Sequence, residues 1–109
     1  MRVMLINPPI DCVLEEGHVS PVTQYLFYNS APLGILYIAS MLEKHGHEVS
    51  VIDAAAELLD VESTTARIQE WEPDVIGIGS FTVTFDTTCR LAQRIKSTMP
   101  EVPIVLGSY

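Results

Sequence analysis

The amino-acid sequence predicts an α/β fold in which helices cover both faces of a parallel β-sheet. Short segments that are almost wholly apolar alternate along the chain with longer segments of helical periodicity. The apolar segments lack the polar–apolar alternation of a half-exposed strand, which is typical of parallel strands buried on both faces. At 109 residues and 48% hydrophobic, the chain is long enough to form one domain with its own core.

The first strand is predicted at Arg2–Ile6, a run rich in large and β-branched residues. Asn7-Pro8-Pro9 ends it, because proline has no N–H to donate to a sheet. The following segment, 10–31, has no periodicity but contains three aromatic residues. It is therefore predicted as a long loop, of a kind that often serves a function.

The first helix is predicted at Leu33–His45. Pro32 suits its first turn, where a missing N–H costs nothing, and Gly46 suits a left-handed residue after its last turn. Apolar residues cover much of the circumference of this helix, which predicts burial on more than one side. Glu48–Asp53 follows as the second strand.

The second half of the chain continues the same alternation. The remaining elements are predicted as a helix through Val61 and Trp71, a strand at Val75–Gly79 buried on both faces, a helix capped by Thr84 or Asp86 and ended by Pro100, and a strand at Pro103–Gly107. The apolar stripe predicted for the last helix consists of Phe85, Cys89, Ala92, Ile95 and Met99.

This order predicts a Rossmann-like or flavodoxin-like parallel sheet of about four strands with helices on both faces. In such sheets ligands bind outside the carboxyl ends of the strands. The positions to which this rule directs attention are Asn7–Pro9, Asp53, Ser80–Thr84 and Gly107–Tyr109.

Composition excludes several classes of partner. Acidic residues outnumber basic ones 14 to 6, for a formal charge of −8, which argues against binding nucleic acid or an anionic membrane. No apolar run approaches the roughly 20 residues that a membrane span needs. Cys12 and Cys89 lie far apart, which predicts reduced thiols in a cytoplasmic protein and no metal site.

Common cofactor and catalytic motifs are missing or misplaced. Gly77-Ile78-Gly79 echoes a dinucleotide fingerprint, but it lies inside a predicted strand and lacks the third glycine. There is no P-loop and no hydrolase nucleophile elbow. The phosphate-accepting aspartate of a receiver domain would follow the third strand, where this chain has Ser80.

Five tracts, taken in order, resemble the N-terminal cobalamin-binding domain of cobalamin-dependent radical S-adenosylmethionine enzymes. They are Asn7-Pro8-Pro9, Ala31-Pro32-Leu33-Gly34, His45-Gly46-His47-Glu48-Val49, Pro73-Asp74-Val75-Ile76-Gly77 and Val102-Pro103-Ile104-Val105-Leu106-Gly107. The resemblance spans essentially the whole chain.

The resemblance implies that cobalamin lies over the carboxyl ends of the strands, with its nucleotide tail entering beside the third strand. Hydroxyls after this strand would contact the tail or its phosphate, glycines would let it approach closely, and Asn7, Pro8, Leu33 and Gly34 would border the corrin ring. The implied cofactor-binding residues are Asn7, Pro8, Leu33, Gly34, Gly79, Ser80, Phe81, Thr82, Thr84 and Gly107.

The chain departs from related patterns at three points. Other cobalamin carriers use D-x-H-x-x-G to supply a histidine to cobalt, and Val13 stands at the histidine position, so no histidine lower ligand is expected. The family usually has a further helix and a fifth strand, which we expect to be missing here. The three-cysteine iron–sulfur motif of the radical domain is absent, so the chain is expected not to be catalytic alone.

The resemblance therefore describes a corrinoid-binding module of a longer methyltransferase or cyclase. S-adenosylmethionine and the iron–sulfur cluster would belong to a radical domain after Tyr109. Two alternatives stay open: a cofactor-free interaction or oligomerisation module that uses the exposed edge of the fourth strand, and a flavin- or nucleotide-binding protein of flavodoxin-like fold.

Overall fold

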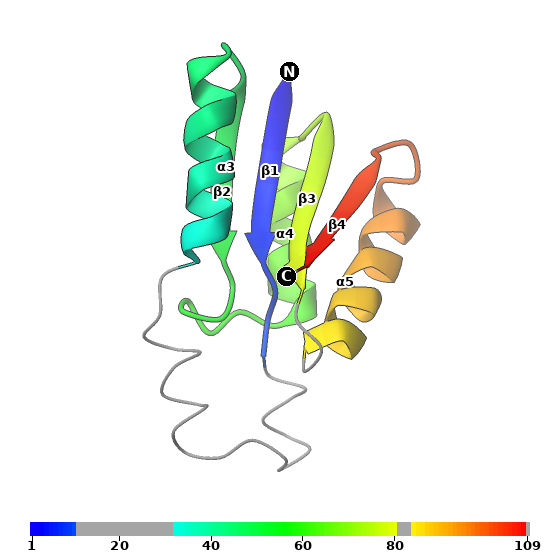
Figure 1. Ribbon diagram of the computed structural model, residues 1–109. Helices are drawn as coiled ribbons and strands as arrows, with labels where there is room; N and C mark the ends of the chain where they lie inside the picture. Colours follow the sequence, from blue (N-terminus) through cyan, green and yellow to red (C-terminus); the bar gives the residue numbers. More distant parts are fainter. Residues whose placement is uncertain (11–31, 81–83, 109) are drawn as a thin grey trace.

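The computed structural model describes residues 1–10, 32–80 and 84–108 of the chain. These residues form a four-stranded parallel sheet of order β2-β1-β3-β4, with helices on both faces (Figure 1). The elements are β1 Arg2–Asn7, α3 Leu33–Lys44, β2 Glu48–Asp53, α4 Val61–Trp71, β3 Val75–Ser80, α5 Phe85–Thr98 and β4 Ile104–Ser108. The predicted fold class and the order of elements are confirmed. No helix in these ranges is long and apolar enough to cross a membrane.

The two faces of the sheet are covered to different extents. The front face carries α3, which lies over β1 and β2, whereas α4 and α5 lie behind the sheet (Figure 1). Among the described elements, no helix ribbon lies in front of β3 or β4, although the Ile35 side chain of α3 reaches Gly79 of β3.

The rear face holds most of the core. Side chains from three strands and both rear helices are almost fully buried there, and α4 and α5 also contact one another. The buried cluster consists of Met4, Ile6, Ile52, Ala54, Ile68, Ile76, Ile78, Leu91 and Ile95. At about 25 cal/mol per Å² of apolar surface, this cluster is the main source of stabilising burial.

The front core is thin, and the burial predicted for α3 is wrong in extent. Of the residues that the structure describes, only Val3, Leu5 and Ala39 are buried in the front cluster, with Ile35 and Leu42 of α3 packed beside them. Ile35, Ala39 and Leu42 are spaced as one helical stripe, so α3 contacts the sheet along one side. The other apolar residues of the helix are exposed: Leu33, Leu36, Tyr37, Ile38 and Met41.

The apolar stripe predicted for α5 is also partly wrong. Phe85 is exposed and Cys89 is only half-buried, whereas Leu91 and Ile95 are fully buried against the sheet. Threonines complete the buried side of the helix, namely Thr87 and Thr88. A threonine stripe was not recognised because a polar side chain is ordinarily expected to face water.

The amino-terminal edge of the sheet is closed by Arg2. Its guanidinium forms an ion pair with Glu48 at 2.9 Å, donates to the Trp71 carbonyl at 2.6 Å and lies 4.1 Å from the Trp71 ring centroid. Its backbone N–H donates to Asp74 at 2.7 Å. These contacts join the starts of β1, β2 and β3. At this edge, the polar groups of Arg2, Glu48 and Asp74 therefore bind one another.

Candidate functional site

The opposite edge, where the four strands end, brings one position from each strand into a row across the sheet. Asn7 pairs in register with Asp53, and Gly79 pairs with Gly107. Because Ile6 pairs with Ile78, the next residues, Asn7 and Gly79, are also neighbours. We call Asp53, Asn7, Gly79 and Gly107 the edge row. The row has a polar side chain on each of β2 and β1, and a glycine on each of β3 and β4.

Three hydrogen bonds hold the polar half of the edge row in place. The Asn7 Nδ2 donates to Asp53 Oδ1 at 2.8 Å, and the Ala54 N–H donates to the Asn7 carbonyl at 3.0 Å. Asp53 Oδ1 also accepts from the Ala56 N–H at 3.2 Å, which fixes the carboxylate in the turn after β2. Both side chains are half-buried, so this geometry is set by the backbone of two adjacent strand ends.

The glycines of the front face are not equivalent. A Cβ on Gly77 would lie 2.9 Å from Leu5 Cδ2, and one on Gly79 would lie 3.1 Å from Ile35 Cδ1. These two glycines therefore let side chains of β1 and α3 pack over β3. A Cβ on Gly107 would meet no atom of the described part of the chain within 4 Å. Gly107 is thus the glycine of the edge row with open space above it.

Buried hydroxyls gather where β3 ends and α5 begins. Ser80 and Thr84 are 6% and 2% exposed, and both make polar contacts. Thr87 and Thr88 are 1% and 0% exposed, and their Oγ1 atoms have no hydrogen-bond partner among the described residues. An unpaired buried hydroxyl costs about 1–3 kcal/mol of desolvation, so this pair is an unusual feature of a core helix.

The structure places the predicted residues that it describes at this edge of the sheet. They come from the ends of β1, β3 and β4 and from the starts of α3 and α5: Asn7, Pro8, Leu33, Gly34, Gly79, Ser80, Thr84 and Gly107. Pro8 is buried, whereas Leu33 is 63% exposed at the first turn of α3. Phe81 and Thr82 lie outside the described residues, as do Val13, Cys12, Tyr109 and most of the predicted loop 10–31.

Sequence reasoning missed the partner of Asn7. Asp53 was noted only as a strand end, although its position directly after an apolar strand was the available signal. The unpaired hydroxyls of Thr87 and Thr88 had no such signal, because the apolar pattern that locates the buried side of a helix does not include threonine. Neither feature requires a metal, and the described ranges contain no group of three His, Cys, Asp or Glu residues arranged to hold one.

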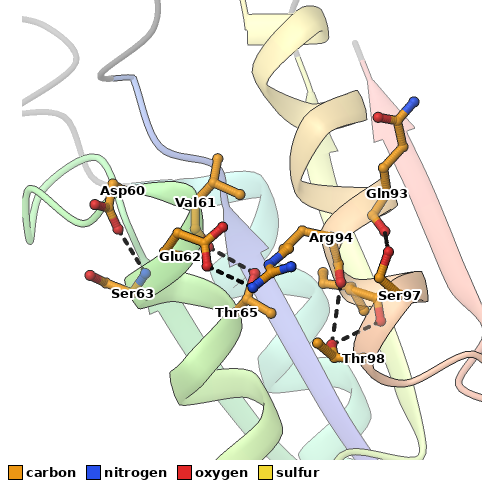
Figure 2. A network of polar contacts seen from close by, with 10 residues as sticks. Asp60, Val61, Glu62, Ser63, Thr65, Gln93, Arg94, Ser97 and Thr98 are labelled. Atoms are coloured by element: carbon orange, nitrogen blue, oxygen red, sulfur yellow. Dashed lines mark hydrogen bonds and ion pairs between the residues drawn. The ribbon is translucent and has the colours of Figure 1, made fainter.

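A hollow lies elsewhere, between the outer sides of the rear helices. It has a volume of about 500 Å³ and mixed charge, because Arg94 pairs with Glu62 at 3.0 Å across it (Figure 2). Asp60 and Arg90 also line it, and all four side chains are exposed. Its acidic and basic side chains are exposed and of equal number, so the groove offers no buried polar group that would select a ligand.

Fold and edge together define a parallel α/β domain with the features of a ligand-binding site at the carboxyl ends of its strands. A family model described as the B12 binding domain matches residues 19–108. The chain belongs to this B12-binding domain family. No solved structure matches the chain at a significant level.

Three curated proteins are similar to the chain over nearly its whole length. An uncharacterised methyltransferase of Pyrococcus horikoshii is 28% identical over 98% of the chain. The cytidylyl-2-hydroxyethylphosphonate methyltransferase of Streptomyces wedmorensis is 29% identical over 97% of it. The anaerobic magnesium-protoporphyrin IX monomethyl ester cyclase of Synechocystis is 29% identical over 98% of it. The matched regions cover 21%, 22% and 20% of these proteins, so the chain spans about a fifth of the length of the relatives it matches.

Proposed function

We propose that the chain is the cobalamin-binding module of a radical S-adenosylmethionine enzyme of methyltransferase or cyclase type, and that it does not catalyse a reaction alone. The observation that carries this proposal is the edge row, which lies where the B12-binding family would hold its ligand. When bound, cobalamin supplies cobalt-centred methyl-transfer or radical chemistry to the enzyme.

The described residues fit such a ligand in two respects. Gly107 leaves space on the front face that a side chain would fill. The hydroxyls of Ser80 and Thr84 are buried beside the carboxyl end of β3, where they can hydrogen-bond polar atoms of a nucleotide tail. The proposed contacts to the ligand come from hydroxyls, an amide and glycines. They need no basic side chain, in keeping with a chain of net charge −8.

In this proposal the residues of the module bind and orient. Asn7 and Pro8 border the ring from the end of β1, and Leu33 and Gly34 border it from the start of α3. Ile35 lies over Gly79, so it has to change rotamer if the tail passes this position. The exposed side chain of Leu33, in the first turn of α3, would help to exclude water from the bound ring.

The parent protein is proposed from the relatives. Two are named as methyltransferases and one as a cyclase, and all are about five times the length of this chain. We place the S-adenosylmethionine site and the iron–sulfur cluster in a domain after Tyr109, because the sequence has two cysteines and no three-cysteine motif. Two distant cysteines also favour a reducing, cytoplasmic location.

A binding experiment tests the proposal. The protein is incubated with hydroxocobalamin and desalted, and the visible spectrum is recorded. Retention of corrin absorbance is expected, and Gly107→Val should reduce it at least about ten-fold by filling the open space, with little effect on folding because valine is favoured in strands. A spectrum without corrin absorbance from the unmodified protein would overturn the binding claim.

The matched control is Gly46→Ala, at the opposite edge of the sheet. Gly46 has a φ of +86°, so alanine is strained there and should cost about 1 kcal/mol of stability. Corrin retention should nevertheless stay normal. Equal losses in Gly46→Ala and Gly107→Val would assign both effects to stability and remove the support from Gly107.

The cofactor-free alternative draws on a different observation. Val105 is 59% exposed on β4, which is an edge strand among the described strands, and the exposed side chains of α3 share its face. This arrangement favours self-association through a second copy. Light scattering after size exclusion tests it, and a monomer at every concentration would count against it. The family match gives the flavin alternative no support.

A further inference from the structure

The end of β1 carries a hydrogen-bond acceptor whose orientation is fixed before any ligand arrives. The Asp53 carboxylate can only accept, so the Asn7 atom that lies 2.8 Å from it must be the amide nitrogen. The amide cannot rotate by 180° without placing its oxygen against that carboxylate. The geometry therefore settles which end of the Asn7 amide faces Asp53, and its oxygen Oδ1 faces the other way.

The Asp53 carboxylate is itself held from behind. Its Oδ1 accepts a second hydrogen bond from the Ala56 N–H, and the Asn7 backbone carbonyl accepts from the Ala54 N–H. No described residue donates to Asn7 Oδ1. The edge row thus presents the Asn7 side-chain oxygen in a fixed orientation. Asp53 lies on the nitrogen side of the amide, and Gly79 lies on the neighbouring strand β3.

Such an acceptor selects ligand groups that donate. A primary amide, with two N–H groups, can satisfy Asn7 Oδ1. A carboxylate at the same place has no proton to donate and would meet a carbonyl oxygen and the negative charge of Asp53. A buried polar group left without a partner discriminates strongly between otherwise similar ligands.

We propose that the Asn7–Asp53 pair makes the site selective for corrinoids with amidated side chains over those with carboxylates. This inference rests on the proposed cobalamin binding. The rim of the corrin ring carries acetamide and propionamide groups, and hydrolysis of one gives a monocarboxylic acid of nearly the same shape. Asp53 does not contact the ligand in this scheme, so it is a positioning residue for Asn7.

The test compares cobalamin with its separated monocarboxylic acids, which differ in the amide that has been hydrolysed. Dissociation constants are measured by the change in the visible spectrum, using the protein at its full natural length. One acid isomer should bind at least about ten-fold more weakly than cobalamin, with the other isomers closer to it. That isomer identifies the amide that meets Asn7.

Two variants separate positioning from charge. Asp53→Asn lets the Asn7 amide turn its nitrogen outward, so the penalty on that one isomer should fall to about three-fold or less while cobalamin still binds. Asn7→Ala removes the acceptor and should abolish the same penalty, which keeps the test decisive if Asp53→Asn fails to fold. Glu101→Gln, exposed on the turn before β4, removes the same charge and should leave every ratio unchanged.

The outcomes separate the two proposals. If no corrinoid binds, the proposed function fails and this inference fails with it. If cobalamin binds but every acid isomer binds equally well, only the inference fails. Retention of the isomer-specific penalty in both Asp53→Asn and Asn7→Ala would also overturn it, because neither residue would then be its source.

Discussion

The two faces of the sheet differ in how completely they are covered, although the same four strands supply both. On the rear face, Ile76 and Ile78 of β3 are at most 1% exposed beneath α4 and α5. On the front face, the same strand presents Gly77 and Gly79, and its neighbour Val105 is 59% exposed. Alternate residues of β3 therefore serve different purposes. The isoleucines build the rear core, and the glycines place no side chain on the front face.

This difference assigns stability and binding to separate layers. The buried residues of the rear cluster come from three strands, two helices and the turn after β2. The front cluster has three buried residues, from α3 and β1, with partly buried residues of β2 and β3 beside them. A ligand that enters over β3 and β4 displaces little of the packed core. The division predicts that substitutions can damage one property and leave the other intact.

The largest expected effect comes from opening the rear core. Ile78→Ala should lower the free energy of unfolding by about 2–4 kcal/mol, because it leaves a cavity in a fully buried cluster. Val105→Ala, on the front of β4, should change it by less than about 0.5 kcal/mol. Urea unfolding followed by circular dichroism measures both. A loss above about 1 kcal/mol in Val105→Ala would show that the front of β4 is covered in solution and would break the comparison.

The rear face was the easier one to predict from sequence. Apolar runs identified β1, β3 and β4, and a segment that alternates and then turns apolar identified β2. Pro32, Pro73 and Pro100 marked where helices begin or end. These signals are local, because they depend on backbone donors and on the period of apolar residues. Of the two caps predicted for the last helix, Thr84 and Asp86, Thr84 occupies the N-cap position, although its side chain makes no capping bond.

The front face was harder to predict, because its properties depend on glycines without side chains and on a helix with no second surface against it among the described residues. The apolar circumference of α3 predicted burial on several sides, but burial needs a second surface, and the sequence pattern does not supply one. Likewise, a glycine pattern did not distinguish Gly79, which accommodates Ile35, from Gly107, which faces open space. The Asn7–Asp53 hydrogen bond joins strands 46 residues apart, so only the register of the sheet reveals it.

A smaller effect should come from the unpaired hydroxyls on the rear helix α5. Thr88→Val replaces an unpaired buried hydroxyl with a methyl group of similar size and should raise the free energy of unfolding by about 1 kcal/mol. The matched control is Thr65→Val on α4, where the hydroxyl donates to the Val61 carbonyl at 2.8 Å. The control should be neutral or destabilising, and thermal unfolding measures both. A destabilised Thr88→Val would mean that its hydroxyl has a partner in solution.

The smallest expected effect on stability comes from the N-terminal caps, which differ between the helices of the two faces. The rear helix α4 is capped by Asp60, whose side chain accepts from the Ser63 N–H at 2.7 Å (Figure 2), whereas Pro32 gives the front helix α3 no side-chain cap. The hydrogen bonds from Ser63 lower the pKa of the Asp60 carboxyl below its ordinary value of 3.8. The cap therefore stabilises the folded state above about pH 4, and this contribution is lost as the pH falls through the lowered pKa.

Asp60→Asn tests this difference between the helices. Asparagine can still cap α4, but it does not titrate, so the variant should lose less stability than the original protein when the pH falls from 5 to 3, as measured by urea unfolding at each pH. Glu101→Gln, which removes one exposed carboxylate on the turn before β4, is the control. Because the cap belongs to the rear layer, cobalamin retention at pH 7 should be the same in Asp60→Asn as in the unmodified protein. Weaker retention there would show that the start of α4 also supports the edge row, and the division between the two faces would have to be redrawn.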